Sequence, residues 1–290
     1  MIGSKKSNRM WVLFFLLPSL LGFALFIIYP IFYSLGVSFT NWDLINAKEF
    51  IGFGNYSRLL SDPQFWNSLK NTFYFIIGYL PSVMIIGLLI ALLLNSKLKM
   101  KVLFRGIYFL PVVTSWVAVS LVWKWLFNPK FGLINYFIEM IGLSGPSWLN
   151  DPKTAMIAII ITSVWKDIGF IMVLYLGGLQ NISTSLYEAA GIDGASKFQQ
   201  FWKITLPMLK PTTFFVSMIS LINSFQVFDQ VNIMTEGGPG DSTTVLVQNI
   251  YNSAFKYSEM GYAAAMSWVL FLIILVVSLV QIWGERKLSK

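Results

Sequence analysis

The sequence predicts an all-α membrane protein with six transmembrane helices, and three observations lead to this prediction. Of its 290 residues, 56% are hydrophobic and only 12% are charged, whereas a soluble globular domain carries about 25% charge. Its mean hydropathy is +0.66. The hydrophobic residues form six stretches that reach the roughly 20 residues needed to cross a bilayer core of about 30 Å. These stretches are approximately residues 11–35, 72–94, 106–127, 154–177, 212–234 and 262–283.

The first hydrophobic stretch follows three basic residues, an order that also occurs in signal peptides. Its apolar run is longer than the core of about 7–15 residues in a signal peptide, and no A-x-A-like cleavage site follows it. We therefore expect a retained helix. Residues 1–71 are predicted to form a peripheral transmembrane helix and an outer loop, residues 72–283 a core transmembrane domain, and residues 284–290 a cytoplasmic tail.

Two prolines fall within the next stretches, Pro81 in the second and Pro111 in the third. Membrane helices tolerate proline where neighbouring helices satisfy the freed carbonyl group, so each proline marks either a bend along a pathway or an ordinary packing kink. Trp123 and Trp125 lie at the end of the third stretch. Tryptophan favours the headgroup level, so these residues are expected to mark the membrane interface. After it, residues 131–143 are amphipathic and predict a short helix at the outer surface.

An even number of crossings leaves both ends of the chain on one side, and the basic residues indicate which side. Lys and Arg are enriched in the cytoplasmic segments of membrane proteins. The tightest basic cluster, Lys97 to Arg105, lies between the second and third stretches, and both ends of the chain are basic. We therefore predict cytoplasmic termini. The predicted cytoplasmic segments contain Lys5, Lys6, Arg9, Lys97, Lys99, Lys101, Arg105, Lys197, Lys203, Lys210, Arg286, Lys287 and Lys290.

Composition also excludes several kinds of chemistry. The chain has no cysteine and no histidine, which excludes thiol nucleophiles, disulfides, Cys/His zinc sites and imidazole catalysis. The net charge is +8, but the basic residues stand at the ends of apolar runs and thus indicate topology, not a nucleic-acid-binding face. We expect neither an enzyme nor a nucleic-acid partner.

Residues 178–211 connect the fourth and fifth stretches, and the predicted orientation places them in the cytoplasm. Ser185 and Glu188 have the spacing of a capping box, in which each side chain bonds the backbone N–H of the other residue. This predicts a short helix that continues to Ala190. Gly191 is predicted to end it, because glycine reaches left-handed backbone angles at little cost.

A turn at Asp193 and Gly194 is predicted to lead into a second short helix at about residues 195–204. Pro207 and Pro211 then direct the chain back toward the membrane. Two short helices that meet at glycines are therefore expected to lie outside the bilayer. By its residues alone, this hairpin is either a docking surface or an interfacial segment without a partner.

The same loop carries a family resemblance. Residues 187–211 read YEAAGIDGASKFQQFWKITLPMLKP, which resembles the EAA loop of permeases in binding-protein-dependent ABC importers. The carbohydrate branch of that family has the form EAAxIDGAxxxQxFxxITLPxLxP. The resemblance covers nearly the whole chain and fits best the first of the two paired permeases of maltose/glycerol-3-phosphate type, without the extra leading spans and large outer domain of the maltose example. Further matching segments are FTNWD at 39–43, FRGIYFLPVV at 104–113, FGLINY at 131–136 and the GGP-x-x-x-T element in EGGPGDST at 236–243.

This resemblance implies a type I ABC importer permease fold with a cytoplasmic coupling (EAA) loop at about residues 183–211. In that family, the first short helix of the loop docks into a cleft on a separate ATPase subunit. Its small residues allow close backbone approach, while Glu188 either pairs with a basic group of the ATPase or stays in its own helix cap. The residues assigned to this coupling contact are Glu188, Ala189, Ala190, Gly191, Asp193 and Gly194.

The resemblance further implies a multi-pass subunit of the bacterial inner membrane that transports a sugar or oligosaccharide. Its expected partners are a second permease, two ATP-binding subunits, an extracytoplasmic solute-binding protein and membrane lipid. No cofactor is expected in this chain, and ATP and Mg are expected on the ATPase subunits. The glycine-rich residues 236–243 lack the GK[ST] ending of a Walker A loop, and no Walker A sequence occurs elsewhere, so another chain must hydrolyse ATP.

Polar residues recur in the fifth stretch. On a single helix, Asn223, Gln226 and Gln230 would form one stripe, with Asp229 beside it. Amides donate and accept hydrogen bonds, so this stripe is a candidate pathway for a hydroxyl-rich solute. Phe225 and Phe228 would supply aromatic faces for sugar rings. The other interpretation is hydrogen bonding between helices, at about 0.6 kcal/mol per contact.

Two charged residues are adjacent in the fourth stretch, Lys166 and Asp167. Neighbouring residues on a helix do not face each other, so we expect each to pair elsewhere or lie near water. A stand-alone secondary transporter or channel remains the alternative function. This alternative is disfavoured because the chain has no clear internal repeat. It would also leave the EAA loop without a function.

Overall fold

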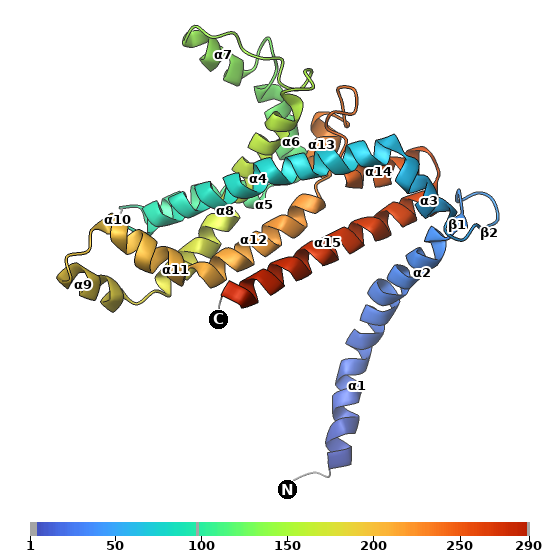
Figure 1. The fold of residues 1–290 in the computed structure, drawn as a ribbon, viewed down its shortest axis with the longest axis horizontal. Helices are drawn as coiled ribbons and strands as arrows, with labels where there is room; N and C mark the ends of the chain where they lie inside the picture. The colour runs from blue at the N-terminus through green and yellow to red at the C-terminus, as the bar shows by residue number, and fades with distance from the viewer. Residues whose placement is uncertain (1–4, 97–98, 289–290) are drawn as a thin grey trace. The chain divides into compact units, whose positions relative to one another are not determined.

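The computed structural model describes residues 5–96 and 99–288, so the basic residues Lys97 and Lys290 lie outside the described part. Figure 1 shows a largely helical chain. In order, its elements are α1 (Lys5–Phe23), the π-helical turn η1 (Ala24–Ile28), α2 (Tyr29–Ser38), β1 (Thr40–Asn41), β2 (Glu49–Phe50), α3 (Gly54–Ser61), α4 (Pro63–Asn95), α5 (Lys101–Val113), α6 (Trp116–Leu126), α7 (Leu133–Met140), α8 (Ala155–Gln180), α9 (Thr184–Ile192), α10 (Lys197–Gln200), η2 (Phe201–Thr205), α11 (Leu206–Met208), α12 (Lys210–Phe225), α13 (Asp229–Met234), α14 (Leu246–Tyr251), η3 (Asn252–Lys256) and α15 (Met260–Leu288).

The chain divides into two compact units. The first comprises Met1–Asp62 and Ile250–Phe271, and the second comprises Pro63–Asn249 and Leu272–Lys290. In the first unit, β1 and β2 pair antiparallel with Thr40 opposite Phe50. The buried Asn55 side chain of α3 donates hydrogen bonds to the carbonyl groups of Ser38 and Thr40, each at 2.9 Å. These bonds satisfy carbonyl groups at the end of α2 and fix the turn into the hairpin.

Within the first unit, four polar side chains join α3 to the beginning of α15. Both terminal guanidinium nitrogens of Arg58 donate to the carboxylate of Glu259 at 2.9 Å. The Tyr262 hydroxyl donates to Asp62 at 2.5 Å, and the Arg58 guanidinium lies 4.0 Å from the centroid of the Tyr262 ring. Because the Arg58 and Glu259 side chains are 52% and 38% exposed, this ion pair orients the two helices more than it stabilises them.

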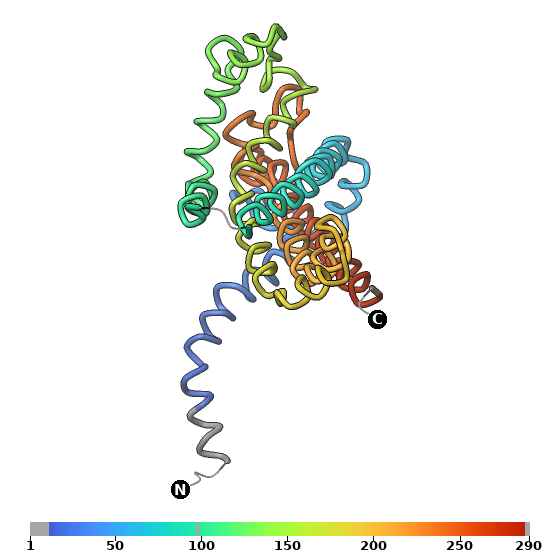
Figure 2. Tube along the Cα trace, turned by 90° about the vertical axis from the view of Figure 1, so that its left-hand side faces the viewer, coloured from blue at the N-terminus to red at the C-terminus, as the bar shows by residue number. Residues whose placement is uncertain are grey.

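The core of the second unit is built on α4 and α8, with α12 packed against both (Figures 1 and 2). Small residues allow the close approach, because a Cβ atom at Gly78 or Gly87 of α4 would press on Ile160 or Ile171 of α8. On the other side of α8, a Cβ atom at Gly169 would collide with the backbone of α5 at Tyr108. Small residues at such contacts let membrane helices gain van der Waals contact without a hydrophobic driving force between them.

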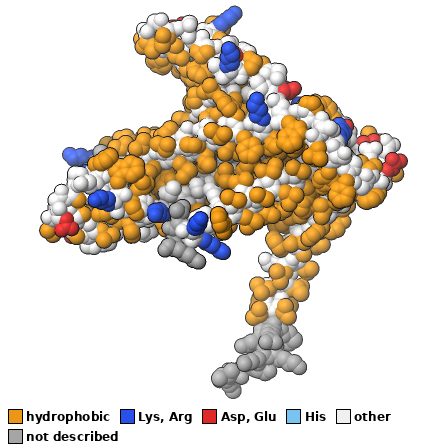
Figure 3. Space-filling model, viewed as in Figure 1, with side chains coloured by type: hydrophobic (Ala, Val, Ile, Leu, Met, Phe, Trp, Pro, Cys, Tyr) orange, Lys and Arg blue, Asp and Glu red, His pale blue; other side chains and the backbone are white. Residues whose placement is uncertain are grey.

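Within residues 5–96 and 99–288, four helical segments are long and apolar enough to cross a membrane, and two bent helix pairs raise this number to as many as six. The four are Val12–Ser38, Pro63–Asn95, Ala155–Gln180 and Met260–Lys287. The bent pairs are Lys101–Val113 with Trp116–Leu126 and Lys197–Met208 with Lys210–Phe225. Hydrophobic side chains cover most of the face shown in Figure 3, as a lipid-facing surface requires.

The third apolar stretch, residues 106–127, is not one continuous helix, and a bend, one of the two alternatives for Pro111, is found two residues after this proline. The segment bends by 100° between α5 and α6. Thr114 is extended, with φ −79° and ψ 141°, and Ser115 caps α6 by accepting a hydrogen bond from the backbone N–H of Val117 at 3.3 Å. The break follows Pro111 closely, whereas α4 continues through Pro81 to Asn95. The extended Thr114 ends α5, and the Ser115 cap starts a new helix at Trp116.

The short helix expected within residues 131–143 is present as α7, and the glycine-rich residues 236–243 form a turn. This turn contains residues with positive φ, including Glu236 and Asp241. Asn71 of α4 donates to the carbonyl groups of Asp241 and Thr244 at 2.9 and 3.0 Å. The glycine-rich segment is thus a structural turn fastened to the beginning of α4.

Candidate functional site

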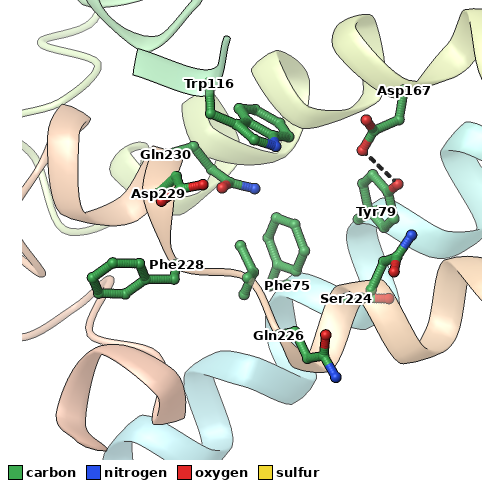
Figure 4. Close-up of a pocket in the computed structure, with 11 residues that line it drawn as sticks. Phe75, Tyr79, Trp116, Asp167, Ser224, Gln226, Phe228, Asp229 and Gln230 are labelled. Carbon is green, nitrogen blue, oxygen red and sulfur yellow. Dashed lines mark hydrogen bonds between the residues drawn. The ribbon is translucent and has the colours of Figure 1, made fainter. Parts of the chain in front are cut away.

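A polar cavity of about 310 Å³ lies within the second unit, where α4, α8, α12 and α13 meet α6 (Figure 4). Aromatic rings and amide or carboxylate groups share its wall. The lining residues are Phe75, Tyr79, Trp116, Asp167, Asn223, Ser224, Gln226, Val227, Phe228, Asp229 and Gln230.

A break in the fifth apolar stretch forms this cavity, so the prediction of one helix over residues 212–234 is wrong. α12 ends at Phe225, and Gln226 leaves the helix with φ −100° and ψ 14°. Phe228, with φ −149° and ψ −62°, turns the chain before α13 begins at Asp229. Neither proline nor glycine marks this break, so hydrophobic periodicity alone gave no signal for it.

All four predicted pathway residues line the cavity, although not as a stripe on one helix. Asn223, Gln226 and Asp229 are exposed, one before the break, one in it and one after it. Gln230 is only 5% exposed, and its amide nitrogen donates to the Ser163 hydroxyl of α8 at 3.1 Å. Gln230 therefore forms a hydrogen bond between helices, as the other interpretation proposed, and it also lines the cavity.

Phe225 is not available to a solute. It is 1% exposed and packs edge-on against Phe73, with 5.6 Å between the ring centroids. The sequence interpretation of Phe225 as a stacking surface is therefore wrong, whereas Phe228 does line the cavity.

The opposite wall contains residues that the pathway prediction did not include. Phe75 and Tyr79 stand one turn apart on α4, and their rings stack with 5.2 Å between centroids and 12° between planes. The Tyr79 hydroxyl donates to Asp167 of α8 at 2.8 Å (Figure 4). A tyrosine four residues after a phenylalanine places both rings on one helix face, which is the signal that could have identified this wall.

Lys166, next to Asp167, bonds in a different direction, as the sequence predicts for neighbours on a helix. Lys166 is only 5% exposed, and its ammonium group donates a hydrogen bond to the carbonyl of Val112 at 3.1 Å. The same nitrogen lies 4.7 Å from the centroid of the Trp116 ring. Lys166 thus satisfies a carbonyl group at the C-terminal end of α5, where a positive charge is favourable. It also contacts the ring of Trp116 at the start of α6.

Amides, carboxylates and aromatic faces around one cavity can bind a hydroxyl-rich molecule through hydrogen bonds and ring contacts. The chain has no cysteine or histidine. Across residues 5–96 and 99–288, no group of three acidic side chains is arranged to hold a metal ion. The arrangement fits recognition and passage of a solute.

The second candidate site is the surface loop at α9. Its helix includes Glu188 and also Gly191, so the predictions that Ser185 caps it and Gly191 ends it are wrong. Ser183 is the cap, and Gly194, with φ +77°, takes the left-handed conformation. The N–H of Ala195 bonds the carbonyl of Ala190 at 2.8 Å, and the N–H of Gly194 bonds that of Gly191 at 3.1 Å. These are the two bonds of a Schellman motif, and the helix ends at Ile192, two residues later than predicted.

The capping box belongs to the next helix. Ser196 accepts a hydrogen bond from the backbone of Gln199 at 3.3 Å, while the Gln199 side chain accepts one from the backbone of Ser196 at 2.8 Å. The predicted second helix therefore begins at Lys197 and continues through η2 and α11 to Met208. Across the described residues, the Glu188 side chain caps neither helix, so its carboxylate remains at the surface.

α9 offers a surface with apolar side chains, and none of its residues is buried. Ile192 is 87% exposed, and Leu186 is also exposed beside Glu188. One hydrogen bond connects this helix to η2, with the Tyr187 hydroxyl 2.9 Å from the Thr205 hydroxyl. Figure 1 shows α9 at the α11 end of α12, away from α13. An exposed apolar surface on a fastened short helix is typical of a contact with another protein.

The chain matches known proteins along nearly its full length. Residues 83–290 match the family described as "Binding-protein-dependent transport system inner membrane component". The lactose transport system permease protein LacF of Rhizobium radiobacter is 39% identical over 279 residues, which cover 94% of this chain and 93% of LacF. The multiple sugar-binding transport system permease protein MsmF of Streptococcus mutans is 36% identical over 287 residues, covering 99% of this chain and 97% of MsmF.

Solved structures agree with this match. A bacterial ABC transporter involved in the import of the acidic polysaccharide alginate contains a chain with a TM-score of 0.86 and 26% identity, covering 99% of both chains. A second structure of an alginate ABC transporter, in complex with an alginate pentasaccharide-bound periplasmic protein, gives a TM-score of 0.87 at 26% identity. This chain therefore belongs to the family of binding-protein-dependent transport system inner membrane components and is a membrane-embedded permease of an ABC transporter with the type I importer fold.

Proposed function

We propose that this permease forms half of the pathway by which an ATP-driven importer carries a sugar or oligosaccharide across the bacterial inner membrane. In this proposal the chain crosses the membrane six times, with each bent helix pair counted as one crossing and both termini in the cytoplasm. A second permease supplies the other half of the pathway. Two ATPase subunits bind ATP and Mg below, and an extracytoplasmic protein delivers the solute from above.

The observation that carries this proposal is the cavity at the break between α12 and α13. Its exposed amides, Asn223 and Gln226, meet a wall that includes the partly exposed rings of Trp116 and Phe228. Such a wall suits a saccharide because hydroxyl groups need both donors and acceptors, while sugar rings present apolar faces. The names of LacF and MsmF, both sugar permeases, support the same solute class.

The proposed coupling contact is α9 with the turn after it, namely Glu188, Ala189, Ala190, Gly191, Asp193 and Gly194. Exposure of the whole helix supports this assignment, as does the free carboxylate of Glu188, which can pair with a basic group on the ATPase. The Tyr187–Thr205 contact would transmit movement of α9 to η2. From there the chain continues through α11, bends by 63°, and follows α12 to the break at Gln226. The 16 residues of α12 extend about 24 Å at 1.5 Å per helical residue.

In the proposed cycle, ATP binding closes the two ATPase subunits and draws the coupling helices together. Because α12 connects the loop to the cavity, this movement opens the cavity outward, where the binding protein releases its solute. Hydrolysis of ATP then returns the cavity to the inward-open state. The differential contact of α9 with the two ATPase arrangements supplies the free-energy difference that such a switch requires.

Reconstitution of the complete transporter tests this proposal. Uptake should require ATP, the ATPase subunits and the binding protein. Glu188→Lys reverses a charge at the proposed contact, and Gly191→Pro breaks the last turn of α9. Both variants should insert into the membrane normally yet lose ATPase binding and uptake. Uptake that persists without ATP would support a stand-alone transporter, and normal transport by both variants would refute the coupling assignment.

A further inference from the structure

The cavity between α12 and α13 has an uneven charge. Among the residues that the structure describes, two carboxylates, Asp167 and Asp229, line it, and no lysine or arginine does. Asp229 is exposed at the first position of α13, and Asp167 holds a single side-chain hydrogen bond from Tyr79. At neutral pH the formal charge of the lining side chains is therefore negative.

The cation nearest in sequence does not reverse this charge in the cavity. Lys166 is not one of the lining residues, and its ammonium group bonds the carbonyl of Val112 and lies against the ring of Trp116. Its ammonium group is therefore engaged with the end of α5 and with the ring of Trp116. A carboxylate, phosphate or sulfonate on a solute would meet two like charges in a partly enclosed space, where such repulsion is stronger than in water.

Membership of the family leaves the charge of the solute open. LacF is named for a neutral sugar, whereas the transporter of the solved structure imports an acidic polysaccharide. We propose that Asp229 and Asp167 make this half of the pathway a charge filter that accepts neutral and amino sugars and rejects anionic ones. This inference rests on the proposed function only in taking the solute to be a saccharide.

The absence of cysteine from the native chain permits a direct test. Gln226→Cys places one thiol in the cavity, and Ser144→Cys places one at an exposed position outside its lining. In the complete transporter, with the partner subunits freed of cysteine, each thiol reacts with a trimethylammonium-ethyl or a sulfonatoethyl methanethiosulfonate. The measured quantity is the ratio of the two rate constants, normalised to 2-mercaptoethanol.

This ratio should favour the cationic reagent about tenfold more at residue 226 than at residue 144. Adding Asp229→Asn, which keeps the side-chain volume, should lower the ratio at residue 226 about threefold and leave it unchanged at residue 144. The second permease contributes equally with and without Asp229→Asn, so the change of the ratio at residue 226 reports the charge of Asp229. Equal ratios at the two positions, or no response to Asp229→Asn, would overturn the charge filter.

Solute protection of the same thiol separates this inference from the proposed function. Trisaccharides of glucose, glucosamine and galacturonate serve as probes. The first two should slow modification at residue 226, whereas the galacturonate trimer should do so only in the Asp229→Asn background. If none protects while the charge ratio holds, the saccharide assignment fails and the filter stands. If the galacturonate trimer protects best in the unaltered background, the filter fails and the saccharide assignment stands.

Discussion

The Tyr79 hydroxyl donates a 2.8 Å hydrogen bond to Asp167 and joins α4 to α8 at the wall of the cavity. Tyr79→Phe removes this donor and leaves the carboxylate of Asp167 without its side-chain partner. A partner lost by a buried polar group costs about 1–3 kcal/mol, so uptake by the reconstituted transporter should fall at least about fivefold. Tyr74→Phe on the same helix provides the control, because Tyr74 is exposed and does not line the cavity. Equal uptake by the two variants would contradict a role for the Tyr79–Asp167 bond.

Gly169 should be intolerant of any side chain. A Cβ atom there would collide with the carbonyl oxygen of Tyr108, whereas one at Gly177 of the same helix would meet nothing within 4 Å. Gly169→Ala is expected to cost about 1–3 kcal/mol through overpacking between α5 and α8. Gly177→Ala should be neutral or slightly stabilising, because alanine favours helices by up to about 1 kcal/mol over glycine. Thermal unfolding in detergent compares the two, and a similar melting temperature for both would argue against the tight α5–α8 contact.

The end of α9 depends on Gly194. Its φ of +77° is strained for a residue with a Cβ atom, so Gly194→Ala should weaken the Schellman bonds by about 1 kcal/mol. Gly191 is helical and has open space around it, so Gly191→Ala should strengthen the same helix. Hydrogen exchange of the α9 amides should accelerate in the first variant and slow in the second. The opposite order would restore Gly191 as the residue that ends the helix.

The loop between β1 and β2 should loosen in acid. The backbone N–H of Asn46 is the main cause that lowers the pKa of Asp43 below its ordinary 3.8, followed by the Asn46 side chain and the N–H of Ile45. A lowered pKa in the folded state means that the carboxylate stabilises the turn above pH 3.8. That contribution is lost as the pH falls through the lowered pKa. Exchange protection at Ile45 and Asn46, corrected for intrinsic rates, should therefore decrease in acid, but not in Asp43→Asn.

Sequence patterning located most of the helical segments because a membrane helix needs a long apolar run. It failed at two breaks, after Val113 and after Phe225. The first depends on a serine cap, and the buried Lys166 bonds the carbonyl at the end of α5. The second contains neither proline nor glycine, and only contacts such as Gln230 with Ser163 fix the chain there. Long-range contacts of this kind leave no periodic signal in the local sequence.

The candidate sites, like the helices, were predicted only where the local sequence carries a signal. Polar residues are rare in apolar stretches, which singled out Asn223, Gln226 and Asp229, and all three line the cavity. Phe75 and Trp116 were not singled out, because aromatic residues are common in membrane helices and mark a site only once the helices are packed. In the surface loop, two serines are near the start of α9, and the choice of Ser183 over Ser185 depends on a difference of two residues in the start of the helix.

The contact between Tyr187 and Thr205 should be required for coupling but not for ATP hydrolysis. It is a side-chain bond between α9 and η2, with 2.9 Å between the hydroxyl oxygens. Tyr187→Phe and Thr205→Val both remove this bond and preserve shape, and Thr205→Val also removes a 3.4 Å bond to the carbonyl of Gln200. The single variants should hydrolyse ATP while transporting less solute per ATP. Because both remove the same bond, the double variant should show no more than the larger single loss.

The measurement is the ratio of solute imported to ATP hydrolysed in proteoliposomes, with Ser185→Ala as a control on the exposed side of α9. Additive losses would mean that the two hydroxyls act separately, and an unchanged ratio in all three variants would place the mechanical link between α9 and α12 elsewhere.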